Sequence, residues 1–334
     1  MILVTGGTGL IGSHLLYHLV NNEKKVRALY RSKSSLDKVA KVFGYYSDQS
    51  AQLMDHIEWV EGDITDIGKL ENAFEGIALV YHCAALISFD PKDFEKLEKT
   101  NVEGTANIVN LCLKHNVQKL CYVSSIAAIG SSVKGKVATE ENDWNETSAS
   151  VYGLTKYNAE LEVWRGSQEG LPVVIVNPGV VIGPGFWKSG SGTFFIYTAK
   201  GKKHFIPGGT GFVSVQDVVN AMVSLTSSGV RSERFILVNQ NLTYEQLFQK
   251  IAPKLRVQPP TKKLSYFSLE VFWRLDWIRS NLLGKKRQLS KAIAKGLYHQ
   301  EVYDNSKLGK AIEFQYGDLD KDIAFCCRKF KDRQ

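Results

Sequence analysis

The stretch TGGTGLIG, residues 5–12, decides the fold of this chain. It follows an apolar run that begins at Ile2 and it opens an amphipathic segment, which predicts a strand, a tight turn and a helix. The glycines fit G-x-G-x-x-G from Gly7 and G-x-x-G-x-x-G from Gly6. Glycine is needed because the turn must be tight, the backbone must approach a pyrophosphate and the helix must pack closely on the strand. The stretch therefore predicts dinucleotide binding, with a glycine-rich turn that holds no ligand as the alternative.

The residues expected to contact the cofactor lie in this turn and at the start of the helix. Free backbone amides at a helix N-terminus hydrogen-bond to phosphate oxygens. The predicted set comprises Gly6, Thr8, Gly9, Leu10, Ile11 and Gly12.

Beyond this stretch, short β-branched runs alternate with amphipathic segments up to about residue 182. This alternation predicts an α/β fold with a parallel, doubly wound sheet, and residues 213–240 predict a further helix and strand that return to it. The pattern is looser over 183–212 and 241–334. We therefore predict a dinucleotide-binding domain over 1–182 and a smaller, mostly helical region that covers the substrate.

Length and composition indicate an ordinary globular protein of one large domain or two. It has 334 residues, of which 44% are hydrophobic and 23% charged. Five cysteines show no C-x-x-C spacing, which argues against structural zinc and a disulfide framework and favours reduced thiols. The first residues lack the basic segment and the apolar stretch of a secretory signal. No run of eighteen apolar residues, which would indicate a membrane-spanning helix, occurs. We expect a cytoplasmic protein without a bound metal or a nucleic-acid partner, as a monomer or a homodimer.

The end of the second predicted strand bears on the choice of cofactor. An NAD-selective site places an acid there to bind the ribose 2′-hydroxyl. This chain has Arg31 and Ser32 instead, and a cation with a hydroxyl suits a 2′-phosphate. NADP(H) is therefore favoured and NAD(H) is the alternative, unless Arg31 is merely a solvated loop residue.

Two further strand ends add predicted cofactor contacts. In GDITD, Asp63 is expected to accept a hydrogen bond from the adenine amino group, with Ile64 beside it, although a turn-forming carboxylate is the alternative. In YHCAA, Ala84 and Ala85 allow backbone to lie close to a ribose. His82 in the same run is expected to be a core histidine rather than a catalyst.

The stretch YGLTK, residues 152–156, places Tyr152 and Lys156 on one face of a helix. Taken alone this is a surface pair. Together with TGGTGLIG, GDITD, YHCAA, TNVEGT, YVSS and NPG in order, however, it resembles the extended branch of the short-chain dehydrogenase/reductase family, most specifically over residues 1–220. The resemblance implies a Rossmann-type fold.

The resemblance also assigns roles to residues. It implies catalysis by Ser125, Tyr152 and Lys156, with Lys156 also on the nicotinamide ribose and Asn101 steadying the helix. Ser124 is an alternative to Ser125. After the sixth strand, the resemblance places Pro178, Val180 and Val181 against the nicotinamide carboxamide.

The chemistry agrees with these roles. Hydride reduction of a ketone leaves an alkoxide, which needs a proton and a hydrogen-bond donor at once. Tyr152 is expected to give the proton and Ser125 the hydrogen bond. Because a phenol has a pKa near 10, we expect the Lys156 ammonium and the nicotinamide ring to lower the pKa of Tyr152.

Within the family, the pattern favours a reductase. Dehydratases carry Asp-Glu where Ile126 follows Ser125, and epimerases carry an Arg where Gly211 precedes Phe212. The chain looks more like dihydroflavonol 4-reductases and 3β-hydroxysteroid dehydrogenases, which implies a bulky, rather apolar ketone or secondary alcohol. A sugar-nucleotide epimerase and a non-catalytic NADP(H)-binding regulator are the alternatives. The candidate substrate-binding residues are Ser125, Phe89, Phe186 and Trp187.

One segment is unusual in its composition. Residues 264–287 are apolar almost all round and end in Lys285-Lys286-Arg287, within a stretch that carries nine Lys or Arg against two acids over 262–295. A helix packed under a lid is expected here, and contact with a membrane surface is the sharper alternative.

Overall fold

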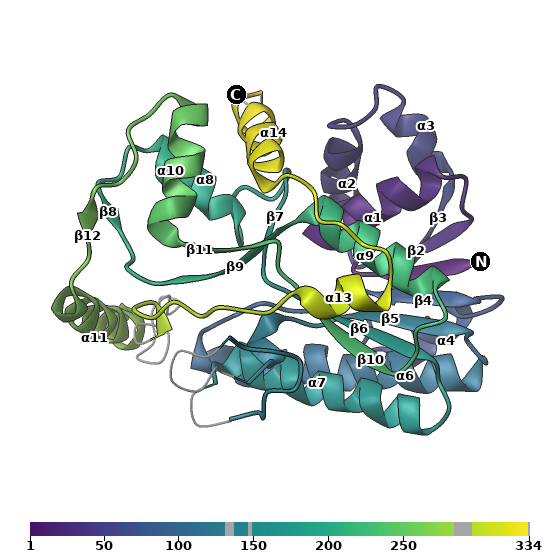
Figure 1. Cartoon of the computed structure of the whole chain (residues 1–334). Coiled ribbons are helices and arrows are strands. Elements are labelled where there is room, and N and C mark those ends of the chain that lie inside the picture. Colours follow the sequence, from purple (N-terminus) through teal and green to yellow (C-terminus); the bar gives the residue numbers. More distant parts are fainter. Residues whose placement is uncertain (131–136, 146–148, 284–295, 333–334) are drawn as a thin grey trace.

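The structure is a computed structural model that describes residues 1–130, 137–145, 149–283 and 296–332. Its centre is a seven-stranded sheet in the order β10-β6-β5-β4-β1-β2-β3, and every pair of neighbouring strands is parallel (Figure 1). The strands are β1 (Ile2–Thr5), β2 (Val26–Tyr30), β3 (Ile57–Glu61), β4 (Leu79–His82), β5 (Lys119–Val123), β6 (Val173–Pro178) and β10 (Glu233–Leu237). The predicted doubly wound, Rossmann-type sheet is confirmed.

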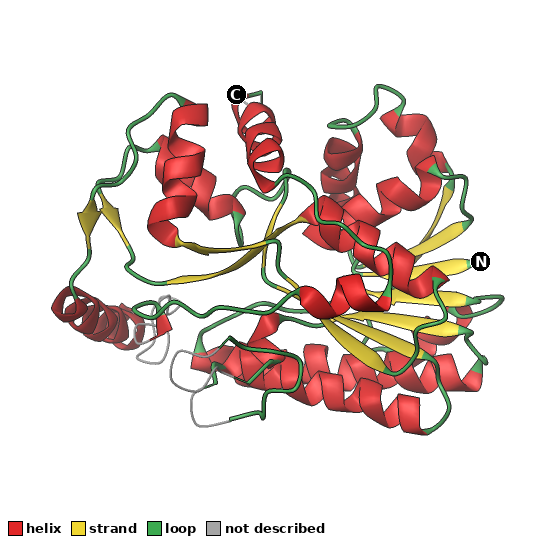
Figure 2. Cartoon of the chain, in the orientation of Figure 1, coloured by secondary structure: helices red, strands yellow, loops and turns green. Residues whose placement is uncertain are grey.

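Helices cover both faces of this sheet, as Figure 2 shows. Successive strand residues face opposite sides, so Leu3 and Val4 belong to different apolar clusters. One cluster is covered by α1 (Leu10–Asn21), α2 (Leu36–Phe43), α3 (Ser50–Asp55) and α9 (Val215–Ser227). The other is covered by α4 (Ile67–Ala73), α6 (Gly104–Lys114) and α7 (Val151–Gln168). Short helical turns lie in the connections: η1 (Lys33–Ser35), η2 (Pro91–Asp93), α5 (Phe94–Leu97), η3 (Glu98–Glu103) and η4 (Ile126–Ala128).

The strand order reverses at β1 and β4. The chain turns to one side of the sheet after β1 and to the other after β4, so a crevice forms outside their carboxyl ends, which is where doubly wound sheets bind ligands. The glycine turn, the alanines after β4 and the serines after β5 all lie at this edge.

The remaining chain forms a smaller region beside that edge. Its helices are α8 (Gly192–Ala199), α10 (Tyr244–Leu255), α11 (Tyr266–Leu283) and α14 (Leu319–Lys331), whereas α13 (Ser306–Ala311) lies near β10. It also has two small sheets, one of β7 (Val180–Ile182), β9 (Gly209–Ser214) and β11 (Gln240–Thr243), and one of β8 (His204–Phe205) and β12 (Lys262–Lys263). The sequence did not predict these sheets. None of the helices within the described ranges has the length and apolar character needed to cross a bilayer.

Candidate active site

The glycine turn after β1 has the geometry of a phosphate cradle. Gly6 has φ +67°, and a Cβ atom there would lie 2.5 Å from the backbone nitrogen of Ala84. A Cβ atom on Gly12 would lie 2.2 Å from the carbonyl oxygen of Gly6, so α1 packs directly against the turn. The N-cap of α1, Gly9, makes no side-chain capping bond, and first-turn amides have no acceptor inside a helix. These amides fit a dinucleotide pyrophosphate, with Thr8, Leu10 and Ile11 half-buried around them.

The structure pairs two of the residues predicted to bind the adenosine half. Arg31 Nη1 lies 3.8 Å from Asp63 Oδ2, and these side chains are 71% and 40% exposed. Burial raises the pKa of Asp63, but two hydrogen bonds from Thr65 and the charge of Arg31 outweigh it, so that the pKa lies below its usual value. Because exposed ion pairs are weak, a cofactor phosphate can replace Asp63 as the partner of Arg31. Ser32 Oγ lies 2.9 Å from Ser34 Oγ on the same loop.

The side chain of Ile64 belongs to the core. Ile64 is buried against Gly104, where an added Cβ atom would lie 2.6 Å from Ile64 Cδ1, and its carbonyl oxygen accepts a bond from Asn107 Nδ2 at 3.0 Å. Its side chain therefore fills the core, and the predicted contact of this residue with the cofactor stays a prediction. Ala84 and Ala85, by contrast, follow β4 at the crevice, with Ala85 exposed.

Helix α7 brings Tyr152 to Ser125. Ser150 caps the helix by accepting a bond from Gly153 N at 3.0 Å, and a Cβ atom at Gly153 would lie 2.8 Å from Ala127 O. The glycine of YGLTK thus lets the first turn of α7 pack on η4. Ser125 lies close enough to the hydroxyl of Tyr152 to act on its pKa, and Ser125 Oγ accepts a hydrogen bond from Ala127 N at 3.1 Å.

Lys156 points to an unpredicted partner. Its side chain is buried, and Nζ donates to Tyr122 Oη at 2.5 Å and to Val123 O at 2.9 Å. Burial lowers the pKa of Lys156 to about 7, although the nearby Glu160 carboxylate opposes this shift.

The expected lowering of the Tyr152 pKa is not found. Burial raises the pKa of Tyr152 to about 12, and the bond from Ser125 only partly offsets it. The physical reason is that the Lys156 ammonium faces Tyr122 and Val123. Tyr152 therefore holds its proton at neutral pH in the chain without cofactor.

A buried carboxylate fastens this helix to the sheet. Glu160 is 1% exposed and accepts from Ser124 Oγ at 2.7 Å, Asn177 Nδ2 at 2.9 Å and Arg234 Nη1 at 3.0 Å. These donors come from the ends of β5 and β6 and from β10. Since the Ser124 hydroxyl is bonded to Glu160, Ser125 is the serine that lies next to Tyr152. The network was missed, although the four-residue steps of Tyr152, Lys156 and Glu160 put all three on one helix face.

Asn101 connects the loop after β4 to α7. Its Nδ2 donates to Leu86 O at 3.0 Å and to Thr155 Oγ1 at 3.1 Å, while its Oδ1 accepts from Leu86 N at 2.7 Å. The side chain lies in η3, a π-helical turn, and is fully used by these contacts. The arrangement agrees with a steadying role for Asn101.

The candidate substrate-binding residues separate into two kinds. The ring of Phe89 is 45% exposed and meets Tyr152 edge-on, with ring centroids 5.6 Å apart. Phe186 is half-buried between β7 and α8. Trp187 is instead a core residue, because its ring packs on Phe195 and Phe330 at 5.4 and 5.1 Å, so its assignment to the substrate wall is corrected.

The strand exit predicted to meet the nicotinamide lies at the same edge. Pro178 ends β6, and Val180 and Val181 form the half-buried start of β7. Among the residues that the structure describes, no group of three acidic, histidine or cysteine side chains is arranged to hold a metal ion.

The burial of His82 predicts that the fold loses stability in acid. It is fully buried, with Nδ1 2.6 Å from Thr5 Oγ1 and Nε2 3.0 Å from Thr105 Oγ1, and burial, helped by the Lys156 charge, lowers its pKa to about 3. Below pH 6.5, His82 therefore binds a proton in the unfolded chain but stays neutral in the folded chain. The free energy of unfolding should fall by about 1.4 kcal/mol per pH unit from this residue alone. Urea unfolding between pH 6.5 and 5 measures this slope, and an equal slope in His82→Gln would contradict the assignment.

Comparison with known proteins agrees with this geometry. The model of the NAD dependent epimerase/dehydratase family matches residues 2–237. A putative dihydroflavonol 4-reductase of Synechocystis sp. is 27% identical over 339 residues, which cover 98% of this chain and 94% of the relative. Sterol demethylase protein B of Methylococcus capsulatus is 30% identical over 269 residues, 77% of each chain.

Solved structures share the fold over the whole length. The crystal structure of gox2253 is 26% identical, with a TM-score of 0.82 over 100% of this chain and 98% of that one. UDP-glucose 4-epimerase of Thermotoga maritima is 21% identical, with a TM-score of 0.77 over 99% of both chains, a likeness that concerns the fold alone. Because the family model spans well over half of the residues, the chain belongs to the NAD dependent epimerase/dehydratase family, the extended branch of the short-chain dehydrogenases/reductases, and is an NAD(P)-dependent enzyme.

Proposed function

We propose that this enzyme reduces a bulky, rather apolar ketone to a secondary alcohol with NADPH. The observation that carries the proposal is that the hydroxyls of Ser125 and Tyr152 interact next to the exposed ring of Phe89. A proton donor, a second hydrogen-bonding hydroxyl and an apolar wall then meet at the edge of the sheet where the glycine turn lies.

Each side chain has a defined task in this proposal. Bound NADPH would supply the hydride. Ser125 donates a hydrogen bond to the carbonyl oxygen, and Tyr152 passes its proton to that oxygen as negative charge develops on it. A pKa of about 12 keeps Tyr152 protonated at neutral pH, which suits the reducing direction. Lys156 would hold the cofactor ribose.

The structure gives a steric argument against the epimerase alternative. Gly211 stands where epimerases place an arginine, and a Cβ atom there would lie 2.4 Å from Val238 Cγ2. β9 thus has no room for that side chain at this position. Ile126, Ala127 and Ala128 after Ser125 likewise lack the acids that a dehydratase needs. The names of relatives, including dihydroflavonol 4-reductases, support a reductase.

Absorbance of NADPH tests the proposal directly. The purified protein would be mixed with NADPH and a panel of steroid, flavanonol and simple cyclic ketones, with UDP-glucose as the comparison substrate. We expect NADPH to be consumed with ketones, and the alcohol to be found by mass spectrometry. Tight NADPH binding without consumption by any ketone would overturn the reductase and favour a non-catalytic regulator.

Selectivity for NADPH is expected to depend on Arg31. Arg31→Ala should weaken NADPH binding by about 10- to 100-fold, since one charge-assisted hydrogen bond to the 2′-phosphate is lost, and should hardly change NADH binding. Calorimetric titration with both cofactors measures this. Lys33→Ala, which removes an exposed cation two residues away, is the matched control. Equal affinity of the parent protein for both cofactors would contradict the prediction.

A further inference from the structure

Helix α11 turns an apolar face away from the protein. Leu269 and Ser280 are buried at 3% and 1%, and they mark the side on which the helix packs. Seven of the thirteen strongly exposed large apolar side chains of the described chain lie on this helix. Four of them follow one stripe on the outward side, because their spacing of eight, three and four residues keeps them in line. This outer stripe is Phe267, Leu275, Ile278 and Leu282, exposed by 76%, 55%, 43% and 78%.

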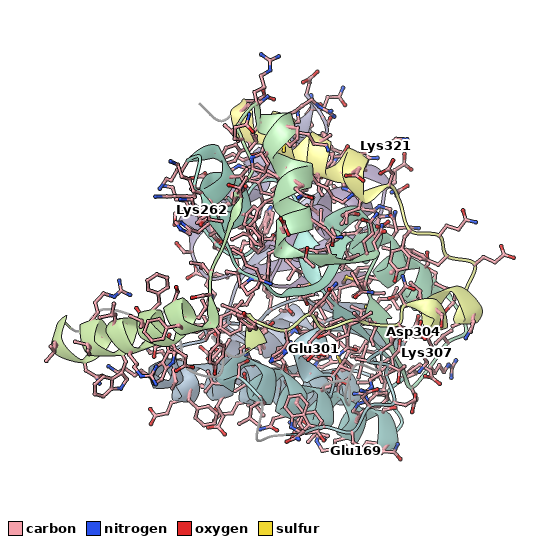
Figure 3. All side chains as sticks on the ribbon, turned by 60° about the vertical axis from the view of Figure 1, so that its left-hand side comes forward. Glu169, Lys262, Glu301, Asp304, Lys307 and Lys321 are labelled. Atoms are coloured by element: carbon pink, nitrogen blue, oxygen red, sulfur yellow. The ribbon has the colours of Figure 1, made fainter. Side chains whose placement is uncertain are left out.

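A group of lysines lies at the start of the same helix. The pairing of β8 with β12 sets Lys262 and Lys263 beside His204 and Phe205, and Lys202-Lys203 directly precede β8. The amides of Thr261 and Lys262 both donate to the carbonyl of Lys203, at 3.0 and 2.8 Å. The four lysine side chains are exposed. In Figure 3, α11 projects from the body, and the strand that carries Lys262 leads into it.

The two acids of α11 do not cancel this charge. Glu270 Oε2 pairs with Arg274 at 2.5 Å, and Asp276 Oδ1 pairs with Arg279 at 2.6 Å. The helix itself is therefore balanced, and the lysine group adds net positive charge at its end. The basic cluster Lys285-Lys286-Arg287 lies outside the described residues.

The segment that follows β4 connects α11 to Tyr152. Lys92 Nζ donates to Ser280 Oγ and Asn281 Oδ1 on α11, both at 3.3 Å. The segment just before Lys92 carries Ile87, 62% exposed, and Phe89, whose ring contacts Tyr152. Two exposed apolar side chains, Ile87 and Phe89, thus lie between α11 and the proposed acid.

We infer that α11 docks the protein on the surface of an anionic bilayer. The outer stripe enters the boundary between headgroups and acyl chains, and the lysine group attracts anionic headgroups. Docking places Ile87 and Phe89 near the bilayer, so that a lipophilic ketone passes from the lipid to Tyr152. Only this last step rests on the proposed reductase function, because docking itself requires no turnover.

Co-sedimentation with lipid vesicles tests the inference without a substrate. The full chain should bind vesicles of phosphatidylglycerol and phosphatidylcholine at least about tenfold more tightly than phosphatidylcholine alone, and less tightly as salt rises. Replacement of Leu275, Ile278 and Leu282 by Ser should reduce binding to both kinds of vesicle by at least about tenfold, because the inserted apolar area is lost. Replacement of Lys202, Lys203, Lys262 and Lys263 by Ser should remove the preference for anionic lipid.

The controls separate docking from folding and from catalysis. Ile67→Ser removes a side chain that is 52% exposed on α4 and should leave vesicle binding unchanged. NADPH affinity of each variant shows that it is folded. Failure of the parent protein to sediment at low salt would overturn the inference. A second result would also overturn it. If sedimentation velocity showed that the parent protein is a dimer and that only the variant with the replaced outer stripe is a monomer, the stripe would bind a second copy of the chain. Ketone reduction is measured in a separate assay without vesicles. The reductase proposal and the docking inference can therefore each fail while the other holds.

Discussion

Tyr152→Phe is expected to lower the turnover number of ketone reduction by about a hundred- to ten-thousandfold, the usual contribution of a general acid. The change deletes only the hydroxyl that meets Ser125, whereas the ring keeps its packing against Phe89. NADPH affinity should therefore be nearly unchanged. Turnover is followed by NADPH absorbance, and affinity by calorimetry.

Tyr157→Phe is the matched control for this change. Tyr157 lies on the same helix, but its ring stacks on Trp144 with centroids 4.4 Å apart. Loss of its hydroxyl should leave turnover unchanged. If Tyr152→Phe reduced ketones as fast as the parent protein, Tyr152 and Lys156 would be a buried structural pair rather than the centre of the reaction.

Glu160→Ala is expected to destabilise the fold by about 3–5 kcal/mol, the cost of breaking a buried ion pair. The change leaves the guanidinium of Arg234, whose side chain is only 19% exposed, without its carboxylate. It also removes the acceptor of Ser124 and Asn177. Denaturant unfolding measures the loss.

Two comparisons make this second prediction specific. Glu162→Ala on the same helix breaks a half-exposed pair with Arg165 and should cost less than about 1 kcal/mol. The double variant Glu160→Ala, Arg234→Met should be more stable than the sum of the single losses, because no uncompensated charge remains. A loss of below about 1 kcal/mol for Glu160→Ala would show that the buried network does not hold the helix.

The central sheet was predictable because its inner strands, such as β4, β5 and β6, are buried on both faces. The continuous apolar run of β5 and the β-branched run of β6 have that cause, and the glycine turn identified the first strand and helix. The small sheets were not predictable in the same way. Strands of two to six residues such as β8, β12 and β9 show no clear period, and their partners are distant in the chain.

Spacing alone predicted only the part of the site that one element carries, whereas Ser125 was assigned by the family resemblance. Tyr152 and Lys156 share a helix, so their spacing placed them together. The bond from Lys156 to Tyr122 joins residues 34 positions apart, and no local pattern reports it. An aromatic such as Trp187 can face either a pocket or a core, and only packing against Phe195 and Phe330 decides between them.

The attachment of Glu160 to donors from β5, β6 and β10 has an evolutionary consequence. Hydrogen bonds of Glu160 fix the helix that bears Tyr152 to the sheet. Phe186 and α11 belong instead to the smaller region beside the edge of the sheet. Insertions and exchanges in that region can change which molecule enters while Tyr152 keeps its position. Because the two parts can change separately, related proteins can acquire different substrates while they keep the same arrangement around Tyr152.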